Sequence, residues 1–347
     1  MANGSGRWRV AGRRVGRWLG LILAALVFGM LVLVAVGLAY QAIAAETDGR
    51  RYPPPGELVD VGGYRMHLDV AGEAGGGPTV ILDAGSQSAS FQWGWVQPEV
   101  AKYAGVVSYD RPGTGWSDAP PEPLDAHEFA EDLREALERV GADGPYVIVG
   151  HSMGSLTARA FAERYPDDVV GAVLVDPRNL SLHEDFPQEF PEAAVPDEPP
   201  LAVGLQDLAA RLGVIRALDP LGDYAAQLPA RQGAEGRAYV ASQKPYGGLW
   251  ADVRLGESAA EALRDGERLD GEPLVVLSAG EPDAMNFPPG DRGEFTAMHA
   301  RMARELSSRG VHRIVRGADH LSIVVERRHA QQLADVVLGV VEEAVAE

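Results

Sequence analysis

The chain has 347 residues, 46% of them aliphatic or aromatic, which is enough for one large domain with an appendage or for two modest domains. It contains no cysteine, which excludes disulfides, thiolate zinc sites and a cysteine nucleophile. Residues 1–45 carry five arginines and no acidic residue, whereas the rest has 26 basic and 50 acidic residues, a formal charge of −24. Such an acidic surface repels nucleic acid, so we expect no nucleic-acid partner.

The first feature along the chain is an uncharged segment at residues 18–45, which follows a basic segment at residues 1–17. About 20 apolar residues span a bilayer, so residues 18–45 predict a transmembrane helix or signal anchor. The arginines before it, and Glu46 and Asp48 after it, predict a cytoplasmic N-terminus and an extracytoplasmic remainder at the cell membrane. The alternative is a secreted protein, because residues 42–44 resemble a signal-cleavage site, although the apolar run is longer than a typical signal core.

The rest of the chain predicts a stiff spacer followed by one α/β domain. Residues 46–56 include three consecutive prolines and form the expected Pro-rich spacer, and residues 57–347 form the domain. The apolar patterns predict a hairpin at 57–61 and 64–71, strands at 79–83, 106–109, 145–149, 169–175, 274–278 and 312–315, and helices at 124–140 and 322–345. This order predicts a mostly parallel central sheet with helices on both faces.

The pattern changes between residues 176 and 272, where no strand is apparent. Short helical segments are predicted at residues 201–218, 223–228 and 233–242. A structureless loop of that length is rare inside a compact domain. We therefore predict a helical cap at about residues 180–270, inserted over the active edge of the sheet.

The motif with the most chemical content is Gly150-His151-Ser152-Met153-Gly154. It closes the apolar run at residues 145–149 and opens a helical pattern at residues 155–164, which is the context of a nucleophile elbow. Such a turn holds its serine in a strained backbone conformation, and the flanking glycines leave the clearance that a Cβ would fill. The sequence therefore predicts Ser152 as a nucleophile.

A serine hydroxyl needs a base, and the base needs an orienting acid. His320 follows a predicted strand and precedes the last helix, so we expect it at the sheet edge as the base. For the acid we favour Asp283, which lies on a Gly/Pro turn a few residues beyond the strand at 274–278. The alternative is Asp176, which ends the strand after the elbow helix.

Acyl transfer also needs hydrogen-bond donors for the developing oxyanion. The elbow supplies the backbone N–H of Met153, and the loop after the strand at 79–83 supplies a second donor, for which we choose the N–H of Ser86. No residue pattern predicts a metal or cofactor site.

With these residues in place, the chain resembles the α/β-hydrolase superfamily over about residues 57–347. The elbow, Asp283 and His320 match its triad, and residues 109–117 (YDRPGTGWS) look like the family's loop after its fourth strand. Within the superfamily the chain is similar to capped, membrane-anchored or exported bacterial hydrolases. The resemblance implies an α/β-hydrolase fold, and Ser152 stands where related epoxide hydrolases and haloalkane dehalogenases carry aspartate.

The function that these residues predict is cleavage of a carboxylic ester of a small or medium apolar substrate by a serine hydrolase. The same triad also fits amide, thioester or carbon–carbon bond hydrolysis and cofactor-free perhydrolysis. A non-catalytic receptor that uses the capped pocket for a small ligand is a further alternative, because fold does not fix function. The expected partners are a small-molecule substrate and the membrane, and the sequence leaves the oligomeric state open.

Overall fold

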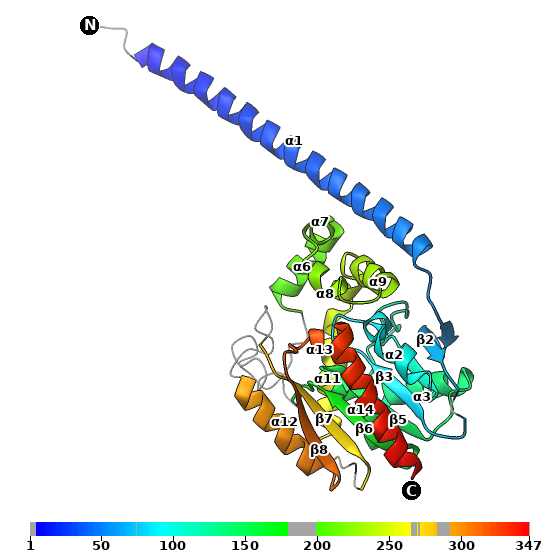
Figure 1. Cartoon of the computed structure of the whole chain (residues 1–347). Helices are drawn as coiled ribbons and strands as arrows, with labels where there is room; N and C mark the ends of the chain where they lie inside the picture. Colours follow the sequence, from blue (N-terminus) through cyan, green and yellow to red (C-terminus); the bar gives the residue numbers. More distant parts are fainter. Residues whose placement is uncertain are drawn as a thin grey trace.

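The computed structural model describes residues 5–73, 75–179, 199–264, 269, 271–282 and 292–346. One long helix, α1 (Ser5–Arg51), projects from a domain built around a central sheet (Figure 1). Asp283 and residues 180–198 of the expected cap lie outside the described residues.

The sheet has eight strands in the order β1-β2-β4-β3-β5-β6-β7-β8. Strands β1 and β2 form an antiparallel hairpin, β2 pairs antiparallel with β4, and all later pairs are parallel. This arrangement confirms the expected α/β fold and its opening hairpin. The strands are β1 (Glu57–Asp60), β2 (Arg65–Ala71), β3 (Thr79–Asp83), β4 (Val106–Tyr109), β5 (Tyr146–His151), β6 (Val169–Val175), β7 (Leu274–Ala279) and β8 (Gly310–Val315).

Helices cover both faces of the sheet because successive strand residues point to opposite sides. On β3, Val80 and Leu82 join the core under one set of helices, and Ile81 joins the core under the other set. The first set is η1 (Ser90–Trp93), α2 (Val96–Val100), α13 (Ser322–Val325) and α14 (Arg327–Val345). The second set is α3 (Ala126–Arg139), α4 (Gly154–Arg164) and α12 (Arg292–Leu306).

Helix α3 begins where the sequence provides a cap. The Asp125 side chain accepts hydrogen bonds from the backbone N–H groups of His127 and Glu128 at 2.8 and 2.9 Å. The Glu128 carboxylate in turn accepts the Asp125 N–H at 3.0 Å, which completes a capping box. This cap sets the start of the helix at Ala126, within the expected segment at 124–140.

Helix α1 differs from the expected division into a membrane segment and a spacer. It continues through residues 46–51, which were expected to belong to the spacer, and ends at Arg51. No proline occurs between the apolar segment and Pro53, and Gly49 alone does not end the helix. The spacer is thereby shortened to the few residues around the three prolines.

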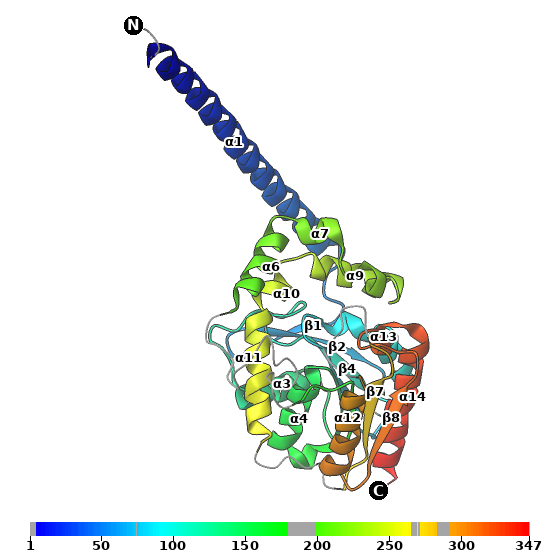
Figure 2. The ribbon, with the colours of Figure 1, turned by 90° about the vertical axis from the view of Figure 1, so that its left-hand side faces the viewer.

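Between β6 and β7 the described residues are helical and contain no strand, in agreement with the expected insertion. The predicted helix at 201–218 is broken at Gly213, whose φ of 72° ends one helix and starts the next. Helix α11 contacts α3 and α4, so it flanks the sheet instead of capping it (Figure 2). The helices are α6 (Leu201–Arg211), α7 (Val214–Leu218), α8 (Gly222–Ala225), α9 (Ala230–Val240), α10 (Lys244–Gly247) and α11 (Leu249–Ala262).

Candidate active site

The turn between β5 and α4 has the geometry of a nucleophile elbow. Ser152 has a φ of 52°, a left-handed conformation that is strained for a serine, and its N–H donates to the Val175 carbonyl at 3.0 Å. A Cβ on Gly150 would lie 2.6 Å from the Gly154 carbonyl oxygen, and a Cβ on Gly154 would lie 2.5 Å from the Ala84 carbonyl oxygen. Only glycine fits at either position, as the motif predicted.

His320 lies on the loop between β8 and α13, at the edge of the sheet where the elbow is. Its Nε2 is 3.0 Å from the Oγ of Ser152, which is hydrogen-bond distance. The two residues are 5% and 3% exposed, so bulk water has little access to the hydroxyl–imidazole pair. The structure brings together the two side chains that the sequence proposed as nucleophile and base.

The carboxylate beside His320 belongs to Asp176, which the sequence analysis named as the alternative acid. Asp176 Oδ2 lies 2.6 Å from His320 Nδ1, the position that a triad acid occupies. Asp283, the favoured candidate, lies outside the described residues. Strand order explains why Asp176 lies near the elbow, because β6, which ends at Val175, is the direct neighbour of β5.

Further contacts fix the orientation of the Asp176 carboxylate. Its Oδ1 accepts the Ala279 N–H at 2.9 Å and a hydrogen bond from the Arg292 guanidinium. Burial alone would raise the pKa of Asp176, but the hydrogen bond and charge of His320, together with the charge of Arg292, outweigh it and hold that pKa well below its usual range. The carboxylate therefore stays ionised at physiological pH and can orient the imidazole.

A second buried histidine connects the loop after β3 to the backbone of His320. The Gly85 N–H donates to the Gln92 side-chain oxygen at 3.3 Å, and the Gln92 amide nitrogen lies 3.3 Å from His151 Nδ1. His151 Nε2 lies 2.9 Å from the His320 carbonyl oxygen. Burial, with the nearby charge of His320, lowers the pKa of His151 to about 3, so this imidazole is neutral.

This connection was not predicted from the sequence. The amide donor faces Nδ1 of His151 and the carbonyl faces Nε2, so the hydrogen-bond pattern assigns the proton to Nε2. The only local signal was the position of His151 beside the nucleophile. Gln92 lies far from both histidines in the sequence, and only the fold brings it next to the elbow.

The predicted oxyanion donors lie on the two segments that adjoin the nucleophile. A Cβ on Gly85 would be 3.6 Å from the Cβ of Ser152, so the loop after β3 passes directly beside the nucleophile. Met153 has a helical φ of −57° at the start of α4. Within the described residues, the backbone N–H groups of Ser86 and Met153 donate no backbone hydrogen bond. Their role as an oxyanion hole stays a prediction.

Arg111, from the loop after β4, holds the same segment in place. Its guanidinium bonds to Asp83 Oδ1 at 2.5 Å, to Asp252 Oδ1 at 2.7 Å and to the Gly85 carbonyl at 3.0 Å. All three charged side chains are 2% exposed. The Ser86 hydroxyl also donates to Asp252 Oδ2, at 3.0 Å. The buried ion pairs therefore clamp the loop between the sheet and α11.

Replacing Arg111 with leucine should destabilise the domain strongly. The change leaves Asp83 and Asp252 buried without their cation, and breaking a buried ion pair typically costs about 3–5 kcal/mol. Arg65→Leu is the matched control, because its pair with Asp118 is exposed and should cost under about 1 kcal/mol. Urea unfolding of both variants measures the difference, and equal losses would show that the Arg111 cluster does not clamp the fold.

Acid should destabilise the domain from near-neutral pH downward. Burial is the main cause that lowers the pKa of His151 to about 3 and of His299 to about 4, against 6.5 for an ordinary histidine. Between these values the unfolded chain binds more protons, so the unfolding free energy falls by up to about 1.4 kcal/mol per pH unit for each histidine. Urea unfolding across this pH range tests the slope. His299→Gln should flatten it and the exposed His127→Gln should not, whereas a slope unchanged by His299→Gln would contradict the assignment.

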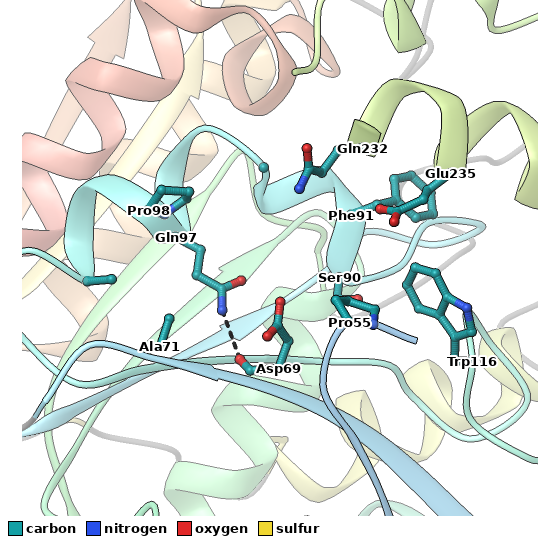
Figure 3. Close-up of a pocket in the computed structure, with 12 residues that line it drawn as sticks. Pro55, Asp69, Ala71, Ser90, Phe91, Gln97, Pro98, Trp116, Gln232 and Glu235 are labelled. Atoms are coloured by element: carbon teal, nitrogen blue, oxygen red, sulfur yellow. Dashed lines mark hydrogen bonds between the residues drawn. The ribbon is translucent and has the colours of Figure 1, made fainter. Parts of the chain in front are cut away.

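A separate cavity of about 370 Å³ lies beside β2 and η1 (Figure 3). Its lining includes Asp69, Ser90, Phe91, Trp116 and Glu235. Gln97 also lines it, and its side-chain amide donates to the Asp69 backbone carbonyl at 2.8 Å. Burial raises the pKa of both carboxyl groups in this lining. Neither Ser152 nor His320 is part of the lining, so this cavity is distinct from the candidate active site.

Comparison with known proteins agrees with the architecture. Residues 76–242 match the family described as alpha/beta hydrolase fold. The "Probable transporter efuK" of Hormonema carpetanum is 31% identical over 141 residues, which are 39% of this chain and 20% of that protein, so the chain spans only a fifth of this relative's length. The Cif epoxide hydrolase of Acinetobacter nosocomialis aligns with a TM-score of 0.65 at 14% identity, covering 87% of this chain and 96% of that one.

An esterase structure gives a similar result. The thermophilic esterase of Thermogutta terrifontis aligns with a TM-score of 0.52 at 22% identity, covering 80% of this chain and 94% of the esterase. The matched region, the eight-stranded sheet and the nucleophile elbow together show that the chain has the α/β-hydrolase fold.

Proposed function

We propose that the protein is a serine hydrolase that cleaves a carboxylic ester of a small or medium apolar substrate through an acyl-enzyme. The observation that carries this proposal is the hydrogen-bonded series Ser152 Oγ–His320 Nε2 at 3.0 Å and His320 Nδ1–Asp176 Oδ2 at 2.6 Å. Nucleophile, base and orienting acid lie in the spatial order that acyl transfer needs.

The proposed reaction has two halves. Ser152 Oγ attacks the ester carbonyl while His320 Nε2 takes its proton, and His320 then gives that proton to the departing alkoxide, which leaves an acyl-enzyme. In the second half His320 removes a proton from water, which attacks the acyl carbonyl. His320 then returns that proton to Ser152 Oγ as the bond to the acyl group breaks, which releases the acid and restores the free enzyme. Asp176 stabilises the imidazolium in both halves, and the N–H groups of Met153 and Ser86 are the proposed donors to the oxyanion.

Several related reactions use the same groups. Amide, thioester and carbon–carbon bond hydrolysis and cofactor-free perhydrolysis all begin with the same activated serine, and a ligand receptor would need no activated serine at all. Turnover of nitrophenyl esters of increasing chain length, compared with the matching anilides, separates ester from amide hydrolysis and an enzyme from a receptor. We expect ester turnover that Ser152→Ala abolishes. Turnover that persists in that variant, or none in the wild type, would contradict the proposal.

We also propose that α1 stays attached as a membrane anchor. The Gln41 amide donates to the Ala241 carbonyl at 2.6 Å, and Arg216 donates to Gln41 at 3.0 Å and pairs with Asp48 at 2.8 Å. Cleavage near Ala45 would remove Gln41 from these contacts with the cap. Residues 17–51 are long and apolar enough for a membrane-spanning helix. The contacts therefore support an anchor over a cleaved signal.

The anchor makes a testable prediction of topology. Arginines before the span and acids after it should hold the N-terminus in the cytoplasm and place residue 57 onward outside. Protease added to intact spheroplasts should digest the domain, and detergent should be needed to extract the protein. A domain digested only after lysis would reverse the orientation. A free mature protein beginning near Glu46 would show that the segment is a cleaved signal.

A further inference from the structure

Helix α6 turns its apolar stripe away from the protein. Leu201, Leu205 and Leu208 recur at the spacing of one helix face, yet they are 79%, 56% and 50% exposed. Helix α7, which contacts α6, also has an exposed leucine, Leu218, at 72% exposed. An amphipathic helix normally buries its apolar face, so an exposed row of leucines on α6 indicates a surface that has a partner.

This surface lies beside α1, and the contacts fix the level at which the two meet. A Cβ on Gly37 would be 2.7 Å from the Leu212 carbonyl oxygen, and a Cβ on Gly213 would be 3.0 Å from the Tyr40 ring. The junction of α6 and α7 therefore rests on residues 37–40 of α1. Figures 1 and 2 agree that α6 and α7 are the part of the domain that lies alongside this stretch of the long helix.

The length of α1 places this junction at a membrane surface. Residues 18–45 have no charge and as a helix would be about 42 Å long, whereas a bilayer core is about 30 Å thick. Trp18 and Tyr40 lie about 33 Å apart along the helix, and aromatic residues of this kind concentrate at the two bilayer interfaces. With Trp18 at one interface, Tyr40 and its contact Gly213 lie at the other.

Charge does not oppose contact between this surface and lipid. Asp207 pairs with Arg211 at 2.7 Å within α6, and Arg216 of α7 pairs with Asp48 of α1 at 2.8 Å. No other charged residue occurs in the two helices, so every charge they carry is paired. The surface is thus locally neutral on a domain whose formal charge is −24.

We propose that the exposed face of α6 and α7, formed by Leu201, Leu205, Leu208 and Leu218, lies on the outer surface of the lipid bilayer that α1 spans. Apolar side chains at an interface enter the boundary between headgroups and acyl chains, and burial of their area stabilises the contact. The lipid surface fits better than a second copy of the chain because the junction of α6 and α7 contacts residues 37–40 of α1, the helix proposed to cross the bilayer. The proposal rests on the membrane anchoring proposed above but not on the reaction.

The absence of cysteine allows a direct test in the full-length chain. Single variants Leu205→Cys and Leu218→Cys, labelled with a small fluorophore, are reconstituted in phosphatidylcholine vesicles that contain nitroxide-bearing lipid. Tyr103→Cys is the matched control, because Tyr103 is a 74% exposed apolar side chain outside this face. We expect lipid nitroxides to quench the first two labels severalfold more than the control, and an aqueous quencher to show the reverse order.

Two further measurements separate the outcomes. Leu33→Cys, in the middle of the span, reports on the anchor alone. If lipid quenches it while the labels at 205 and 218 match the control, the proposal is wrong and the anchor stands. A crosslink between 205 labels of two chains, with no quenching by lipid, would instead assign the face to a dimer and overturn the proposal. Quenching at 205 and 218 in a protein without ester turnover would uphold it while refuting the reaction.

Discussion

Replacing Ser152 with alanine should lower ester turnover by about 10⁴- to 10⁶-fold, the usual loss when a catalytic serine is removed. This corresponds to a rise of about 5–8 kcal/mol in the activation barrier. The reason is that only a hydroxyl at this position can receive the acyl group while His320 Nε2, 3.0 Å away, takes its proton. The fold should survive, because the Ser152 hydroxyl is hydrogen-bonded to the His320 imidazole and the smaller alanine side chain fits in the space of the serine. A fluorophosphonate probe should label the wild type and not the variant.

Ser155→Ala is the control for this experiment. Ser155 is also buried on α4, but its hydroxyl donates to the Ser152 carbonyl at 2.6 Å and does not face His320. Probe labelling should therefore persist in Ser155→Ala. Labelling that survives in Ser152→Ala would assign the nucleophile to another serine.

Asp176→Asn should lower the turnover number by about 10⁴-fold, or about 5 kcal/mol in the activation barrier. The Ala279 N–H and the Arg292 guanidinium both donate to Oδ1 of Asp176, so an asparagine there would place its oxygen toward these donors. Its NH₂ would then face His320 Nδ1 and force the proton onto Nε2. An imidazole with its proton on Nε2 cannot accept the proton of Ser152.

Two matched carboxylates serve as controls for Asp176. Asp319 is next to His320 in the chain, but its side chain accepts the backbone N–H groups of Leu321 and Ser322 at 3.1 and 2.7 Å. Asp319→Asn and Asp283→Asn should both leave the turnover number far closer to that of the wild type. A larger loss from Asp283→Asn than from Asp176→Asn would return the acid to the residue that the sequence favoured.

What the sequence predicted well was local. The apolar runs and the elbow motif depend on neighbouring residues, so the strands, Ser152 and the loop of His320 followed from spacing. Which of Asp176 and Asp283 lies nearer to Ser152 depends on which strand is next to β5. Local sequence patterns do not determine the order of strands in a sheet. The series from Gly85 through Gln92 to His151 was missed for the same reason, because its members meet only through the fold.

Two differences have simpler causes. Helix α1 passes the expected start of the spacer because glutamate, threonine and arginine there all tolerate a helix, so the change in polarity at Glu46 is no stop signal. The predicted helix at 201–218 divides because Gly213 adopts a left-handed φ that periodicity alone does not reveal. That break sets the angle between α6 and α7, and with it the apolar face beside α1.

The central claim is that Ser152 forms a covalent acyl-enzyme, and trapping that intermediate tests it most directly. The full-length protein is mixed with a nitrophenyl ester, quenched with acid within the first turnover, digested and mapped by mass spectrometry. We predict the added mass of the acyl group on the peptide that contains Ser152. An acyl group on a different residue, or ester turnover with water attacking directly and no acylated peptide at any time, would contradict the account.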